Sequence, residues 1–78
     1  MNIGKVFKQE RERAGVTQKV MSEKLGITKS ALWKIESGRN VPKPETVKRF
    51  CFVNRIPLAY LVIMSVEEED FRVAVSSI

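Results

Sequence analysis

The sequence predicts an all-α fold, a compact domain of five short helices, and three observations support it. Apolar residues recur at intervals of three and four along most of the chain, which is the spacing of one helix face. Three successive segments carry both a helix start signal and a helix stop signal. No alternating run rich in Val and Ile occurs before residue 70. With 78 residues, the chain forms one small domain.

The first helix is expected to follow Asn2, whose side chain is a favourable N-cap. Gly15 suits the left-handed residue that ends such a helix. Between them, residues spaced by four, four and three positions are predicted to form the buried face: Ile3, Phe7, Arg11 and Ala14.

Two short helices follow, over 18–25 and 29–37, and a tight turn joins them. Each has a threonine that favours its start and a glycine that favours its end: Thr17 and Gly26, then Thr28 and Gly38. Two helices joined by a short turn containing glycine form a helix-turn-helix, whose second helix can enter the DNA major groove. This segment predicts binding to double-stranded DNA.

Two further helices are expected after a loop with two prolines. Pro44 suits the first position of a fourth helix that runs to about Asn54. A fifth helix begins at Ile56-Pro57. The apolar positions of these two helices are Val47, Phe50, Cys51 and Val53, then Leu58, Leu61 and Val62.

The charge distribution separates a basic body from an acidic and apolar tail. Residues 1–66 hold thirteen Lys and Arg against five Glu, a net charge of +8, whereas residues 67–78 hold one Arg against four acids, a net charge of −3. A basic body favours a polyanionic partner. In the tail, Ser65 and Glu68 have the spacing of a capping box, which predicts a short helix near 67–70. The alternation in Phe71–Val75 is typical of a strand, and we predict no structure beyond residue 70.

Composition excludes several classes of function. The chain has no histidine and a single cysteine, Cys51, which lies in an apolar run and is predicted to be a buried structural thiol. It therefore has no internal disulfide, no zinc cluster and no histidine general base, and we expect no enzyme activity, no cofactor and no metal. The longest apolar stretch, 56–64, is too short to cross a bilayer, and no secretory signal is evident. These features predict a cytoplasmic protein without membrane contact.

Several sequence elements occur together in a recognisable order: Arg11 four residues before Gly15, then Gly15-Val16-Thr17-Gln18, Leu25-Gly26-Ile27-Thr28, Ile35-Glu36-Ser37-Gly38, Pro42, and Ile56-Pro57-Leu58-Ala59-Tyr60-Leu61. In these elements the chain resembles the Cro/C1-type helix-turn-helix family, also called the Xre family, over about residues 3–63. The resemblance implies a lambda-repressor-like domain over residues 1–66, followed by a tail that takes part in dimerisation or binds a partner. Glu10 and Asn54 depart from the apolar residues usual in the family, and we expect Phe52 and Val53 to replace the area lost at Asn54.

The helix over 29–37 is expected to read DNA sequence. Its outward face carries polar and aromatic residues, and Leu32 and Ile35 turn inward. Because the first residues of a recognition helix reach furthest into the groove, the predicted base readers are Lys29 and Ser30, with Lys34 one turn later. The resemblance implies the same three positions.

Seven other residues are expected to contact the DNA backbone: Thr17, Gln18, Trp33, Ser37, Arg39, Asn40 and Lys43. The start of the second helix offers free N–H groups to a phosphate, and the basic loop after the recognition helix can clamp others. The resemblance also implies that Gln18 braces the start of the third helix. Trp33 has two alternative roles, packing on a neighbouring helix or joining a dimer contact.

The resemblance further implies a salt bridge between Arg11 and Glu36, because a largely buried charge needs a partner. Taken together, these features predict a sequence-specific transcriptional regulator, a repressor acting as a homodimer. The predicted dimer surface is Tyr60, Met64, Phe71 and Val75. Two alternatives remain open: an antitoxin whose tail also binds a toxin, and a protein-interaction module that no longer reads DNA.

Overall fold

A computed structural model describes residues 1–71, and every regular element in that range is helical. The helices are α1 (Ile3–Arg13), α2 (Gln18–Leu25), α3 (Lys29–Glu36), α4 (Pro44–Asn54) and α5 (Leu58–Ser65), followed by one helical turn over 68–71. The predicted all-α class is confirmed, and α3 ends one residue earlier than predicted. Val75, predicted at a dimer surface, lies outside the described residues.

Local capping explains where the first three helices begin. In each case a side-chain oxygen accepts a backbone N–H three residues later: Asn2 from Lys5 at 3.0 Å, Thr17 from Val20 at 3.2 Å, and Thr28 from Ala31 at 3.0 Å. Gly26 ends α2 with a φ of 70°, a conformation that glycine adopts without strain. This glycine allows the chain to reverse tightly between α2 and α3.

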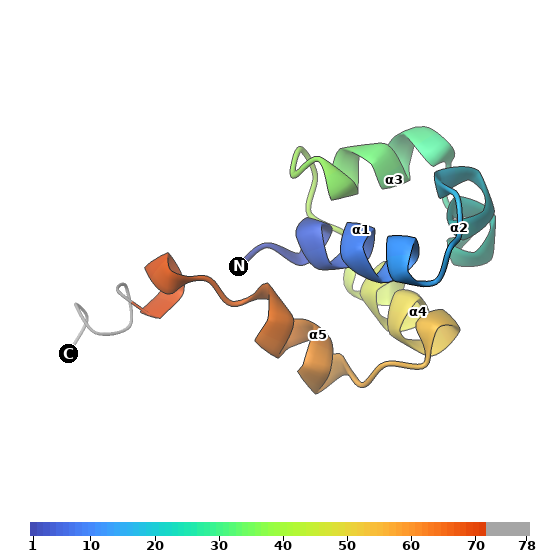
Figure 1. The fold of residues 1–78 in the computed structure, drawn as a ribbon. Coiled ribbons are helices and arrows are strands. Elements are labelled where there is room, and N and C mark those ends of the chain that lie inside the picture. The colour runs from blue at the N-terminus through green and yellow to red at the C-terminus, as the bar shows by residue number, and fades with distance from the viewer. Residues whose placement is uncertain (72–78) are drawn as a thin grey trace.

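One apolar core holds the helices together. In Figure 1, α1 lies in the middle of the molecule, with α3 on one side and α5 on the other, and both contact it. α2 packs on α3 and α4. The Phe7 and Phe50 rings stack with centroids 3.9 Å apart, joining α1 to α4. The buried residues are Val6, Phe7, Met21, Leu25, Leu32, Ile35, Phe50, Cys51 and Leu61.

The buried face of α1 is rotated from the predicted one. Ala14 is exposed, whereas Glu10 is only 8% exposed. The Glu10 carboxylate accepts a hydrogen bond from the Tyr60 hydroxyl at 3.0 Å and lies 3.5 Å from the Arg13 guanidinium. Glu10 is therefore tolerated at a buried position because α5 and the end of α1 supply its partners.

The end of α4 also differs from expectation. Phe52 is 84% exposed and does not replace the apolar area lost at Asn54, because it lies two residues after buried Phe50 and so points to the opposite side of the helix. Only Val53 packs partly against the core. The Asn54 amide instead donates to the Phe50 carbonyl at 2.8 Å.

The predicted capping box in the tail is absent. The Ser65 hydroxyl donates to the Leu61 carbonyl at 2.6 Å within α5, so it does not cap the next turn. Asp70 performs that role, accepting the Glu67 N–H at 2.8 Å and the terminal amine of Met1 at 2.8 Å. The hydrogen bond from the amine lowers the pKa of the Asp70 carboxyl. The helical turn thus forms close to where it was predicted, with a different cap.

Candidate nucleic-acid interface

α3 presents its polar face to solvent, on the side of the molecule away from α5 (Figure 1). Leu32 and Ile35 are buried, as the helical period predicts. All residues expected to meet DNA from this helix and its C-cap are exposed: Lys29, Ser30, Trp33, Lys34 and Ser37. The three predicted base readers therefore share one accessible surface.

The start of α2 lies against α3 and extends this surface. Gln18, Lys29, Ser30 and Trp33 line a shallow hollow of about 450 Å³. The Gln18 amide donates to a Glu36 carboxylate oxygen at 3.1 Å. Glu36 is the last residue of α3, so this hydrogen bond from Gln18 braces the end of the helix and not its start. Thr17 is exposed beside it and caps α2.

A buried ion pair fixes α1 against α3. Arg11 Nε lies 2.7 Å from Glu36 Oε2, and Arg11 Nη2 donates to Glu36 Oε1 at 3.0 Å. The two side chains are 12% and 3% exposed. The hydrogen bond with Glu36 raises the pKa of Arg11. This is the pair that the resemblance implied, and it fixes α3 against α1.

The loop after α3 is anchored to that helix. The N–H groups of Arg39 and Asn40 donate to the Lys34 carbonyl at 2.9 Å and 3.2 Å. The Arg39 guanidinium lies 4.8 Å from the centroid of the Trp33 ring, a cation–π arrangement. Trp33 is 45% exposed, so it belongs to the surface and not to the core. The loop and α3 consequently form one continuous face.

The cations on this face have no acidic partner among the described residues. Within residues 1–71, no ion pair involves Lys29, Lys34, Arg39 or Lys43. Lys43 and Asn40 are exposed on the loop. Unpaired cations that flank a polar helix face suit backbone contacts, which orient a protein on a duplex.

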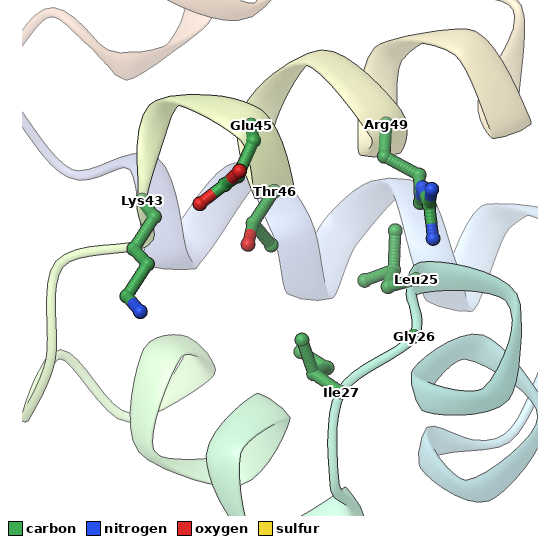
Figure 2. A pocket seen from close by; sticks show the side chains of 7 residues that line it. All are labelled: Leu25, Gly26, Ile27, Lys43, Glu45, Thr46 and Arg49. Carbon is green, nitrogen blue, oxygen red and sulfur yellow. The ribbon is translucent and has the colours of Figure 1, made fainter.

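A neighbouring hollow brings in residues that the sequence analysis did not single out. Lys43 shares this hollow with Thr46 and Arg49 of α4 and with the α2–α3 turn (Figure 2). Thr46 and Arg49 lie about twenty residues from that turn in sequence. No local pattern signals the proximity, because it depends on how α4 packs on α2.

The residues predicted for a dimer surface lie in different surroundings. Met64 and Phe71 are 48% and 64% exposed. Tyr60 is half-buried, and its hydroxyl is already bonded to Glu10 in the same chain. Along α5, further apolar side chains are exposed: Leu58, Val62 and Ile63. This helix therefore carries an uncovered apolar surface.

The described part of the chain contains neither a membrane-spanning helix nor a cluster of metal ligands. None of its helices has the length and apolar character needed to cross a membrane. Residues 1–71 contain no group of three or more metal-ligating side chains. The exposed face of α3 and the adjoining loop remain the main candidate site.

Comparisons with known proteins agree with this geometry. A family model described as a helix-turn-helix domain matches residues 2–56. The chain is also similar to a chain of a solved complex of the SinR protein and the SinI protein, with a TM-score of 0.71 and 23% identity, over 96% of this chain and 77% of that one. Among curated proteins, none matches the chain. At this level of identity, the structural likeness concerns the fold alone.

Proposed function

Since the chain belongs to the helix-turn-helix domain family, we propose that it is a sequence-specific, double-stranded DNA-binding transcriptional regulator. We further propose that it acts in the cytoplasm as a homodimeric repressor. One observation carries the proposal: α3 exposes a polar face whose lysines have no ion-pair partner among residues 1–71, while its apolar face is buried. A helix held in this way can enter the major groove without losing its own packing.

In this proposal, Lys29, Ser30 and Lys34 read base edges. Lysine donates to the N7 and O6 atoms of guanine, whereas serine accepts or donates and discriminates less. The backbone phosphates are held by Gln18 and Thr17 at the start of α2 and by the loop after α3. The full set proposed for the backbone is Thr17, Gln18, Trp33, Ser37, Arg39, Asn40 and Lys43.

Dimerisation follows from the small footprint of one recognition helix. Two copies on half-sites about one helical turn apart read twice as many base pairs, which makes an operator distinguishable. The exposed apolar side chains of α5, including Met64, and Phe71 in the tail support a contact between copies. A Met64→Lys variant that sediments as a monomer, beside a dimeric wild type, is the expected result.

A second candidate function is binding to another protein, as in an antitoxin or a protein-interaction module. The similar solved chain supports it, since that chain belongs to a complex of the SinR protein and the SinI protein. The partner would bind the same apolar surface of α5. The first candidate requires binding to DNA that distinguishes one sequence from another. A protein-interaction module that no longer reads DNA would show no such preference.

The deciding experiment is fluorescence anisotropy with a labelled duplex from the region upstream of the coding sequence, against a scrambled duplex, at two salt concentrations. We expect the native duplex to bind about a thousandfold more tightly. Lys34→Ala should reduce that preference roughly 5- to 150-fold, the effect of losing one specific base contact. Lys48→Ala, an exposed lysine on α4, serves as the matched control and should leave the preference unchanged.

Weak and equal binding to the two duplexes, abolished by salt, would contradict sequence-specific regulation. The protein-binding candidate would then be favoured. A small protein that copurifies with the chain and binds the apolar surface of α5 would identify the partner.

A further inference from the structure

The outward face of α4 carries an aromatic side chain that the folded chain does not bury. Phe52 is 84% exposed. Two arginines flank it, Arg49 three residues before and Arg55 three residues after, and both are exposed. Within residues 1–71, neither arginine forms an ion pair. We call these three residues the α4 patch, an apolar ring between two positive charges.

The backbone at Arg55 indicates that its side chain has a role. Arg55 is the C-cap of α4, and its φ of 55° lies in the left-handed region. A glycine adopts this conformation without strain, whereas a residue with a Cβ does not. The other residues of the described chain with a positive φ are all glycines: Gly15, Gly26 and Gly38. Arg55 therefore contributes something that glycine cannot, a cation beside Phe52.

The start of the tail has the complementary chemistry. The tail turn, residues 67–71, consists of four acids followed by an aromatic residue, Phe71, which is 64% exposed. Two contacts hold the turn to the body of the domain. Asp70 accepts a hydrogen bond from the Met1 amine at 2.8 Å, and the Asn2 N–H donates to the Ser65 carbonyl at 2.8 Å. The turn thus presents Phe71 to solvent from a fixed place.

The tail turn and the α4 patch are too far apart to meet within one chain. Figure 1 shows the tail turn at one end of the molecule and the end of α4 at the other, with α5 between them. When two copies pack α5 against α5 in opposite directions, this order is reversed in the second copy. The tail turn of each copy then lies at the α4 patch of the other. A two-fold dimer makes both contacts at once, because each copy carries both surfaces.

We propose that, in the homodimer, the tail turn of each copy docks on the α4 patch of the other, with Phe71 against Phe52. The proposal rests on the homodimer proposed above and names the surface that receives the tail. Four acids meet two unpaired arginines, so electrostatic complementarity favours this occupant. Contact between the two exposed rings removes apolar surface from water.

The first test measures the dimer Kd by sedimentation equilibrium in the absence of DNA. Phe52→Ser and Phe71→Ser should each raise the Kd roughly a hundredfold, because each removes both aromatic contacts of the dimer. The double variant should be within about threefold of either single variant, since the same contacts are already lost. The matched control is Val41→Ser, which removes an apolar side chain that is 86% exposed on the loop after α3 and should leave the Kd unchanged.

A mixture of the two single variants tests whether the rings meet between copies. In a mixed dimer, Phe71 of the Phe52→Ser copy faces Phe52 of the Phe71→Ser copy, so one of the two contacts is intact. The mixed dimer should therefore form about tenfold more tightly than either variant forms with itself. A mixed dimer whose stability is only the mean of the two variant dimers would overturn the proposal, because the two rings would then act independently.

The second test concerns charge. Arg55→Glu should raise the dimer Kd about tenfold at low salt, and the effect should shrink at high salt because exposed charges are screened. Lys8→Glu makes the same change of charge beside Trp33 and Ser37, on the side of α3, and should alter the Kd by less than about twofold. Equal effects of the two variants would overturn the placement of the tail on the α4 patch. Circular dichroism verifies that each variant is folded.

The variant Met64→Lys separates a failure of this proposal from a failure of the homodimer. If the wild type is a dimer and Met64→Lys is a monomer, while Phe52→Ser and Arg55→Glu dimerise like the wild type, the homodimer stands and the tail contact is wrong. The α4 patch would then belong to an occupant other than a second copy. A wild type that stays monomeric at every concentration would overturn the homodimer and this proposal together, and the anisotropy assay would still decide DNA reading.

Discussion

The Glu36 carboxylate joins three helices. Replacing Glu36 with glutamine should destabilise the domain, while the DNA affinity of the folded protein should change little. Glu36 lies at the end of α3, and its carboxylate accepts hydrogen bonds from Arg11 of α1 at 2.7 and 3.0 Å and from Gln18 of α2 at 3.1 Å. Glu36→Gln preserves the shape of the side chain but removes the charge. The new amide N–H₂ group would also face the hydrogen-bond donors of Arg11 and Gln18. An N–H₂ group accepts no hydrogen bond from them.

The expected magnitude follows from burial. Removing one partner of a buried ion pair costs about 3–5 kcal/mol. Arg11 is 12% exposed and retains its hydrogen bond to the Val16 carbonyl at 2.9 Å, which places the effect at the lower end. A loss of about 3 kcal/mol corresponds to a fall in Tm of roughly 12–24 °C for a domain of this size. The total stability of such a domain is about 4–12 kcal/mol, so the loss is a large fraction of it.

Thermal and urea unfolding followed by circular dichroism measure this loss, with Glu23→Gln on the exposed side of α2 as the control. A double-mutant cycle with Arg11→Met should give a coupling of about 2 kcal/mol. At a temperature where both proteins are folded, DNA affinity should remain within a few-fold of the wild type. A coupling below about 0.5 kcal/mol, or a Tm within experimental error of the wild type, would refute this account of the ion pair.

Two further predictions concern the core. Gly4→Ala should destabilise the domain by about 2 kcal/mol although alanine favours helix, because a Cβ at Gly4 would overlap the Ile35 carbonyl of α3; an unchanged urea midpoint, beside the exposed control Gln9→Ala, would contradict this close approach. Burial raises the pKa of the Cys51 thiol above its ordinary 9.0. The buried thiol therefore contributes its full stabilisation below the pKa of the unfolded chain, and this stabilisation is lost as the pH rises through the pKa of the folded protein. The urea midpoint should therefore fall more between about pH 7 and about pH 10 in the wild type than in Cys51→Ala, and parallel pH profiles would contradict the shift.

Local sequence determined most of the secondary structure. Thr17 and Thr28 cap helices because their oxygens reach a backbone N–H only three residues away, and Gly26 ends α2 because a glycine accepts a positive φ. These effects act within one turn of chain. The outward face of α3 was equally predictable, since Leu32 and Ile35 fix by periodicity which side is buried.

Tertiary structure decided the partners of polar groups that are distant in sequence. Glu10 is buried because Tyr60, fifty residues away, donates to it. Thr46 faces a hollow because α4 docks beside the α2–α3 turn. Helical periodicity places a residue on a face, but it carries no information about which helix covers that face or how closely. Burial of a polar side chain is favourable only when a partner meets it, and the docking of the helices decides which partners are present.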